Sequence, residues 1–480
     1  MKRYLLLFQL LFMALATQAL PKLPVIFSDN MVMQQNTIAK IWGTARPKHK
    51  VHVKTTWGAE QTVISDEKGN WTASLATGRA GGPYSITISD GKTITLNNVM
   101  LGEVWLCSGQ SNMEFPVKGW AQVLNADEEV AQASHPDIRL MQIHKVSALQ
   151  PTGKVVANSA TWQVCSPSTI SEFSAVAYFF ARQLTQKLHV PVGVIDATWG
   201  GSNIESWISK ETLSQLPYMK NVLEKLSEPT DRNTPTGLFN GMIDPLIPMA
   251  MRGVIWYQGE QNEQRGYEYR DLFTMLIRDW RNAWQQDFPF YFVQLANFHE
   301  RHHEPVEAEW AEMREAQDMA LHLDHTGMVV TMDVGQGDNV HYPNKQEVGR
   351  RLALQALAKT YGEKVVCDGP RFAGYTINRD TVMVDFSHAY GGLKAKNGRL
   401  TQFTIAGPDH VWHNAQAEIV DSGHVAVWSD RVIMPVAVRY AWQDNPDADL
   451  FNGEGLPAAS FRTDDWQGMT YGKNRTNTDH

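Results

Sequence analysis

Ser111, Asp338 and His341 are the residues whose types and spacing could do chemistry in this chain. A serine hydroxyl becomes an effective nucleophile when a base removes its proton, and a histidine with a pKa near ~6.5 can do so at neutral pH. A carboxylate beside the imidazole fixes its tautomer and stabilises its charged form. Ser111 lies in the run Gly109-Gln110-Ser111-Asn112, and Asp338 precedes His341 by three positions. These residues predict acyl transfer, with Ser111 as nucleophile, His341 as base and Asp338 as the group that orients the base.

A parallel sheet in an α/β arrangement would bring these distant residues together. Five short apolar segments are expected to be buried strands separated by helical segments: residues 104–107, 192–197, 254–257, 290–295 and 328–332. Ligands bind outside the carboxyl ends of such strands. Polar or glycine-rich runs follow four of them, at residues 109–112, 199–203, 258–262 and 335–341. One edge of the sheet should therefore gather the serine, glycines, amides, aspartate and histidine.

Helical signals support this order of elements. Apolar residues with helical spacing predict one helix: Phe173, Val176, Ala177, Phe180, Ala181, Leu184 and Leu188. Asn344 followed by Glu347 is typical of a helix start, with a helix continuing through Ala358. Asp338 and His341 should then lie on the loop before that helix.

Alternating patterns on both sides of this region predict two further β domains. We expect a signal peptide at residues 1–19, an N-terminal β domain at 20–100, an α/β catalytic domain at 101–362, and a C-terminal β domain with a tail at 363–480. The basic start, the short apolar run and the small residues near position 19 predict export, to the periplasm or outside the cell. No later segment has the length and apolar character of a membrane span.

Composition excludes several classes of function. The chain has 43 Lys and Arg against 51 Asp and Glu, a formal net charge of −8, which disfavours a nucleic-acid partner. Its 3 cysteines are too few for a disulfide framework or a zinc site. His299, His302 and His303 lack a matching ligand pattern, so neither a metal nor a cofactor is predicted.

Other nucleophiles are weaker candidates. Ser202 follows two glycines at a strand end, but Asn203 and Glu205 beside it favour a capping or substrate-positioning role. The turn around Ser111 lacks the last glycine of the Gly-x-Ser-x-Gly elbow, which disfavours the α/β-hydrolase fold. Cys107 lies inside an apolar run and is expected to be a small buried residue.

Four ordered sequence blocks resemble those of SGNH-type carbohydrate esterases, specifically the sialate O-acetylesterases. The blocks are residues 109–112, 200–207, 256–262 and 338–341, and residues 23–34 and 455–464 are also similar to that family. The resemblance implies an SGNH-hydrolase-like, flavodoxin-like parallel-sheet domain between two all-β domains. It also implies a serine esterase that removes O-acetyl groups from sugars, typically sialic acid, through an acyl-enzyme on Ser111.

The donors to the oxyanion are expected to be the backbone N–H groups of Ser111 and Gly201 and one side-chain amide. The SGNH superfamily has Gly-x-Asn-Asp in its third block, whereas Gly259 is followed here by Glu260, a glutamine and Asn262. Gln258 is therefore the first choice for the side-chain donor and Asn262 the second. Glu260 is expected to be a structural hydrogen-bond anchor.

The substrate is the least defined feature of the sequence. Xylan or another acetylated glycan is an alternative to sialic acid, and a non-catalytic carbohydrate-binding protein is an alternative of another class. Arg462 could bind the carboxylate of sialic acid, although a surface ion pair is the more ordinary role for it. The predicted substrate-binding residues are Gln110, Asn112, Asn203 and Trp207. The pattern does not indicate an oligomeric state.

Overall fold

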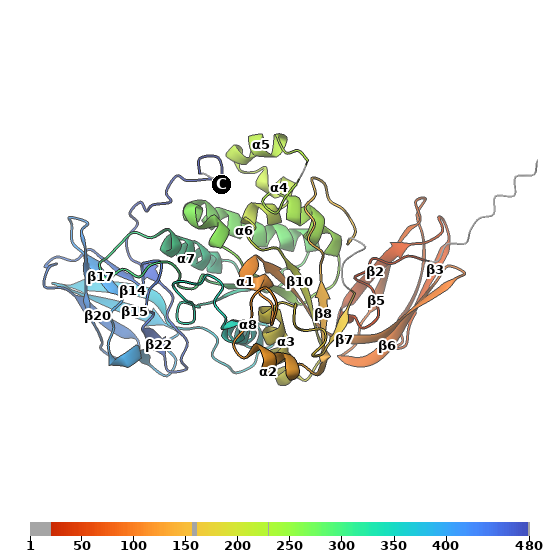
Figure 1. Ribbon diagram of the computed structural model, residues 1–480, viewed down its shortest axis with the longest axis horizontal. Coiled ribbons are helices and arrows are strands. Elements are labelled where there is room, and N and C mark those ends of the chain that lie inside the picture. Colours follow the sequence, from red (N-terminus) through yellow and green to blue (C-terminus); the bar gives the residue numbers. More distant parts are fainter. Residues whose placement is uncertain (1–20, 156–160, 229, 479–480) are drawn as a thin grey trace, which may run out of the picture.

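The structure, a computed structural model, describes residues 21–155, 161–228 and 230–478. The predicted signal peptide at residues 1–19 lies outside the described residues. A β region formed by the first part of the chain, a central α/β region and a β region formed by the last part lie in a row (Figure 1). No helix in the described ranges combines the length and apolar character needed to cross a membrane.

The central sheet runs in the order β13-β12-β11-β7-β10-β8-β9. All neighbours from β13 to β8 are parallel, and only β9 pairs antiparallel, with β8. The strands are β7 (Thr93–Gly109), β8 (His135–Gln142), β9 (Gln163–Cys165), β10 (Val192–Thr198), β11 (Gly253–Tyr257), β12 (Phe290–Val293) and β13 (Thr326–Val329). The chain order reverses at β7, with β10 on one side and β11 on the other. This is the position at which open α/β sheets form a ligand crevice.

Helices cover both faces of this sheet (Figure 1). α3 (Ala175–Leu188) and α8 (Lys345–Lys359) pack on one face, and α6 (Gly266–Trp284) and α7 (Glu309–Met319) on the other. The shorter helices are α1 (Ser111–Glu114), α2 (Ala126–Ala131), α4 (Lys210–Leu213), α5 (Pro217–Glu224), η1 (Ile204–Trp207), η2 (Phe239–Ile243), η3 (Asp244–Leu246), η4 (Glu260–Arg265), η5 (Ala320–His322) and η6 (Lys396–Gly398). The predicted α/β class with a parallel sheet is confirmed.

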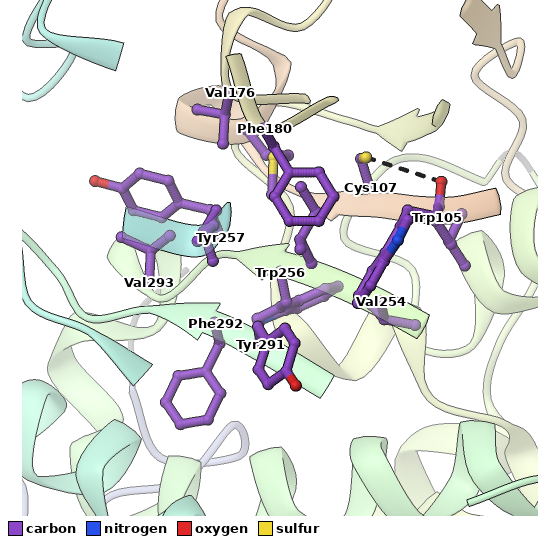
Figure 2. Packing of buried hydrophobic residues seen from close by; sticks show 14 of the residues in the cluster. Trp105, Cys107, Val176, Phe180, Val254, Trp256, Tyr257, Tyr291, Phe292 and Val293 are labelled. Atoms are coloured by element: carbon purple, nitrogen blue, oxygen red, sulfur yellow. Dashed lines mark hydrogen bonds between the residues drawn. The ribbon is translucent and has the colours of Figure 1, made fainter. Parts of the chain in front are cut away.

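Aromatic side chains fill the space between the sheet and its helices (Figure 2). Trp105 of β7 stacks on Tyr291 of β12 with ring centroids 5.9 Å apart and meets Phe180 of α3 edge-on at 5.1 Å. On β11, Trp256 meets Trp280 of α6 edge-on at 5.8 Å. Large buried aromatic rings contribute much of the apolar surface removed from water, so these contacts help to hold the strands and helices together.

β7 is shared between the central sheet and the first β region. Its first part pairs with β6 (Gly81–Ser89), its middle part with β1 (Val32–Gln34), and its last part with β10 and β11. The other strands here are β2 (Ile38–Thr44), β3 (Lys50–Thr55), β4 (Glu60–Ile64) and β5 (Asn70–Ala76). The expected domain boundary at residue 100 therefore falls within a continuous strand.

The last β region contains two four-stranded sheets and a strand pair. Its strands are β14 (Arg371–Asn378), β15 (Thr381–Ser387), β16 (Leu393–Ala395), β17 (Phe403–Ala406), β18 (Trp412–Asn414), β19 (Gln416–Ile419), β20 (His424–Trp428), β21 (Ala437–Tyr440), β22 (Leu450–Asn452) and β23 (Phe461–Arg462). After β23 the chain returns to the central region (Figure 1). There Arg475 donates a hydrogen bond to the carbonyl of Asn233 at 2.8 Å.

Candidate active site

A close contact at the end of β7 sets the position of Ser111. Gly109 has φ +136°, and a Cβ at this residue would lie 2.1 Å from the carbonyl oxygen of Tyr257. Only glycine fits so close to the neighbouring backbone. The next residue, Gln110, donates its N–H to the same oxygen at 3.0 Å. The chain then turns into α1, and Ser111 is the first residue of that helix.

His341 lies beside Ser111, as the sequence pattern predicts for a nucleophile and its base. Its Nε2 is 2.8 Å from Ser111 Oγ, within hydrogen-bond distance. It sits on the loop before α8, and that helix is capped by Asn344, whose side chain accepts from the N–H of Glu347. Trp120 meets the imidazole edge-on, with ring centroids 5.2 Å apart.

The pKa of His341 is lowered from its ordinary value. Burial is the main cause, the nearby Lys345 lowers it further, and the negative charge of Glu114 raises it. A lowered pKa keeps the imidazole neutral at neutral pH, and the neutral form is the one that accepts a proton from serine.

Asp338 lies three positions before His341 on the same loop, but its side chain is exposed. Within the described ranges, no hydrogen bond joins its carboxylate to the imidazole. The loop is held instead by Asn339, whose N–H donates to the carbonyl of Gln336 at 3.2 Å and whose Oδ1 accepts from the N–H of His341 at 3.0 Å. The role of Asp338 as the orienting carboxylate stays a prediction.

Glu114 is a charged residue of the site that the sequence analysis did not identify. It follows Ser111 by three positions in α1, so it lies one helical turn away. Its Oε2 accepts the N–H of Gly200 at 2.6 Å, and its Oε1 pairs with Lys145 Nζ at 2.5 Å. Glu114 therefore ties the helix of Ser111 to the loop after β10.

The two backbone N–H groups predicted as donors to the oxyanion belong to Ser111 and Gly201, which both line the cavity. A Cβ at Gly200 would lie 3.2 Å from Ser111 Cβ, and Gly201 has φ +70°, so the two-glycine turn passes directly beside the serine. In the described part of the chain, neither the N–H of Ser111 nor that of Gly201 has a hydrogen-bond partner. Unengaged N–H groups at a helix start and a turn suit a developing negative charge.

Neither amide that the sequence analysis chose for the oxyanion reaches the active-site cavity. Gln258 is buried, and its amide donates to the carbonyl of Ser202 at 3.1 Å and to Asn262 Oδ1 at 2.8 Å. The Nδ2 of Asn262 donates to Glu205 at 2.9 Å. Both side chains thus link the segment after β11 to the segment after β10, and in this arrangement neither amide is free to donate to an oxyanion.

Gln261 does line the cavity with Ser111 and His341. Its side chain is exposed, and its backbone N–H donates to Gln110 Oε1 at 3.3 Å. Counting directly from Gly259, Gln261 stands where the Gly-x-Asn-Asp pattern has its asparagine. That register is the signal that could have identified it.

A buried polar cluster connects the segments that carry Ser111 and His341. Asn112 Nδ2 donates to Glu260 Oε1 at 2.5 Å and to the carbonyl of Val340 at 3.0 Å, and Asn112 Oδ1 accepts from Lys345 Nζ at 2.6 Å. Burial raises the pKa of Glu260 and lowers the pKa of Lys345 well below its ordinary value. Glu260 is a hydrogen-bond anchor in this arrangement, and Asn112 is a structural residue.

The cavity over Ser111 has a volume of about 550 Å³. A second cavity of about 640 Å³ adjoins it and shares Glu260, Gln261 and Glu263 with it. Volumes of this order accommodate small ligands. The first cavity is lined by Gln110, Ser111, Glu114, Trp120, Lys145, Trp199, Gly200, Gly201, Arg232, Glu260, Gln261, Glu263, Phe298, Trp310, Val340 and His341.

The predicted substrate-binding residues divide between the cavities and the core. Gln110 lines the first cavity, and Asn203 lines the second. Asn112 belongs to the buried cluster, and Trp207 is fully buried against Trp256, with ring centroids 6.0 Å apart. Neither Asn112 nor Trp207 lines either of these two cavities, so the structure does not place the two side chains against a substrate bound there.

Two other sequence candidates also lie away from the cavity. Ser202 is fully buried, and its Oγ accepts the indole N–H of Trp207 at 2.9 Å, so it has no access to a ligand. Arg462 pairs with Glu315 at 2.7 Å and with Asp464 at 3.3 Å. Its side chain is only 4% exposed, so this ion pair is buried rather than on the surface.

The described ranges contain no group of three His, Cys, Asp or Glu side chains that could hold a metal ion. His299 pairs with Glu263, with 3.3 Å between His299 Nε2 and Glu263 Oε2. Cys107, Cys165 and Cys367 are all free thiols.

Comparison with known proteins identifies the family. Residues 101–358 match the family described as carbohydrate esterase, sialic acid-specific acetylesterase. The human sialate O-acetylesterase is 30% identical over 478 residues, covering 90% of this chain and 91% of that protein. The chain belongs to this family of carbohydrate esterases.

Two further relatives support this family assignment. The mouse sialate O-acetylesterase is 28% identical over 399 residues, covering 70% of this chain and 73% of that protein. The crystal structure of a carbohydrate acetylesterase from Xanthomonas citri superposes with a TM-score of 0.85 at 36% identity, covering 93% of this chain and 100% of that one. The family resemblance seen in the sequence blocks is confirmed.

Proposed function

We propose that this esterase removes O-acetyl groups from sugars, with O-acetylated sialic acids as its substrates, through an acyl-enzyme on Ser111. The family description and the activity named for the mammalian relatives support the choice of sugar. The single observation that supports the mechanism is the 2.8 Å distance between Ser111 Oγ and His341 Nε2, at the end of β7 and beside a cavity. We also propose that the central region is an SGNH-type fold.

In the first half of the reaction, Ser111 Oγ attacks the acetyl carbon while His341 Nε2 takes the hydroxyl proton. The carbonyl oxygen becomes an oxyanion, which accepts hydrogen bonds from the N–H groups of Ser111 and Gly201 and from the side-chain amide of Gln261. When the tetrahedral intermediate collapses, the bond to the sugar oxygen breaks. The proton held by His341 passes to that oxygen, which leaves as a free hydroxyl.

In the second half, water attacks the acetyl group on Ser111. His341 takes a proton from the water and returns it to Ser111 Oγ, which releases acetate and restores the enzyme. Asp338 is the proposed orienting carboxylate, supported by its place three positions before His341 on the same loop. Glu114, whose negative charge raises the pKa of His341, stabilises the imidazolium that forms in each half.

Hydrolysis of p-nitrophenyl acetate tests the mechanism, and a panel of O-acetylated sialic acids and acetylated xylan tests the substrate. Ser111→Ala should lower kcat by about 10⁴-fold or more, because the covalent route is lost. Ser202→Ala, which removes a hydroxyl buried in the core, should keep most of the activity. A wild-type protein without activity on any ester would support a binding protein, and faster release of acetate from xylan would reject sialic acid as the substrate.

A further inference from the structure

Arg232 is a charged side chain of the active-site cavity that lies against the two-glycine turn beside Ser111. Its Nη1 donates to the carbonyl of Gly200 at 3.3 Å, and its Cζ lies 3.5 Å from where a Cβ on Gly201 would be. The side chain is otherwise exposed. A guanidinium is therefore present within the cavity that receives the acetyl ester.

The carboxylates that line the same cavity are engaged by other groups. Glu114 pairs with Lys145 at 2.5 Å, Glu260 accepts from Asn112 at 2.5 Å, and Glu263 pairs with His299 at 3.3 Å.

No carboxylate of the described residues forms an ion pair with Arg232, whose one hydrogen bond goes to a neutral carbonyl. An exposed guanidinium without an acidic partner presents a planar fork of donors that matches a carboxylate.

The loop that carries Arg232 is held on both sides. Asp231 Oδ1 accepts the N–H of Asn233 at 2.8 Å, and Asn233 Oδ1 accepts the N–H of Asn203 at 2.9 Å. Arg475, from the returning end of the chain, donates to the Asn233 carbonyl at 2.8 Å. A fixed backbone at Arg232 lowers the cost of ordering its side chain when a ligand binds.

We propose that Arg232 binds the carboxylate of an acetylated sugar acid and makes this esterase selective for anionic over neutral acetylated sugars. The inference rests on the proposed function and adds the residue that recognises the acid. With the acetyl ester at Ser111 and the carboxylate on Arg232, the sugar is held at two points. A neutral sugar leaves the guanidinium without its anionic partner and loses one of these points.

The test compares an O-acetylated sialic acid with the same sugar whose carboxyl group is a methyl ester. Wild-type kcat/KM should favour the free acid by about 10-fold or more, the effect expected of a charge-assisted hydrogen bond. Arg232→Gln should abolish this preference, and Arg232→Lys should keep part of it, because lysine retains the charge but not the fork. Arg431→Gln, which changes an exposed arginine of the C-terminal β region outside the cavity, should keep the wild-type preference.

Equal kcat/KM for acid and methyl ester in the wild type, or an unchanged preference in Arg232→Gln, would overturn the proposal. A wild-type protein that hydrolyses neither sugar nor p-nitrophenyl acetate would instead reject the proposed function. In that case calorimetric binding of unacetylated sialic acid decides the role of Arg232. Weaker binding to Arg232→Gln than to Arg431→Gln supports carboxylate recognition, and equal binding refutes it.

Discussion

Replacing Asn112 with alanine should destabilise the protein strongly, although the side chain touches neither cavity. Three groups lose their hydrogen-bond partner in this variant: the buried Lys345 Nζ, and the partly buried Glu260 Oε1 and carbonyl of Val340. A buried polar group without a partner costs about 1–3 kcal/mol, and a charged one costs more. Water entering the small space left by the amide can satisfy only part of this set. We expect the free energy of unfolding to fall by about 3–5 kcal/mol.

Urea denaturation followed by tryptophan fluorescence measures this loss. The control is Asn378→Ala, which removes an exposed amide from β14 and should change the free energy of unfolding by less than about 0.5 kcal/mol. Under native conditions Asn112→Ala should also lower kcat more than it raises KM. The amide of Asn112 holds the carbonyl of Val340, and because Val340 directly precedes His341, losing this hydrogen bond displaces the catalytic imidazole. An unchanged denaturation midpoint together with a large rise in KM would refute this reasoning. It would mean that Asn112 contacts the substrate, as the sequence first indicated.

Three further predictions concern the catalytic groups. Gln261→Ala should lower kcat by about 10²- to 10³-fold with little change in KM, if its amide donates to the oxyanion; Gln258→Ala should lower the denaturation midpoint instead, and the reverse result would restore Gln258 as the donor. kcat/KM should increase with pH through one ionisation whose midpoint lies below ~6.5, because the base is neutral His341 and burial lowers its pKa. Glu114→Gln removes a charge that raises this pKa, so the rise should move to lower pH, and a shift to higher pH would contradict the assignment. Asp338→Asn should keep measurable activity and be less damaging than His341→Ala, because no hydrogen bond joins the Asp338 carboxylate to the imidazole within the described ranges; equal losses in both variants would show that Asp338 turns inward during the reaction.

The central strands could be predicted where the apolar runs are uninterrupted. Residues 192–197 and 254–257 lie within β10 and β11, and the helix start at Asn344 is confirmed by the cap of α8. β8 was missed because its sequence contains Arg139. This arginine is buried, and its guanidinium donates to the carbonyls of Pro136, Asn30 and Asn98. A run of eight residues cannot reveal partners that lie about forty and more than a hundred positions away.

The site was predictable as a set of strand ends but not as a set of side-chain directions. Ser111 follows β7 and His341 lies on the segment that follows β13. The two residues meet because β7 and β13 are parallel and both end at the same edge of the sheet. Whether an amide faces the cavity depends on which groups compete for it. Gln258 lies at the end of β11, yet Ser202 and Asn262 take its two donors, while Gln261 stays exposed one turn later.

The continuity of β7 limits how this enzyme can be rearranged by recombination or engineering. A chain cut near residue 100 would remove β1 and the first part of β7, and with them the parallel pairing of Val32–Gln34 with residues 100–102. The start of the shortened strand would then lack its partner strand β1, only ten positions before the nucleophile. The N-terminal β region is thus unsuited to exchange as an independent module, and a truncation intended to isolate the catalytic centre would weaken the strand that supports it.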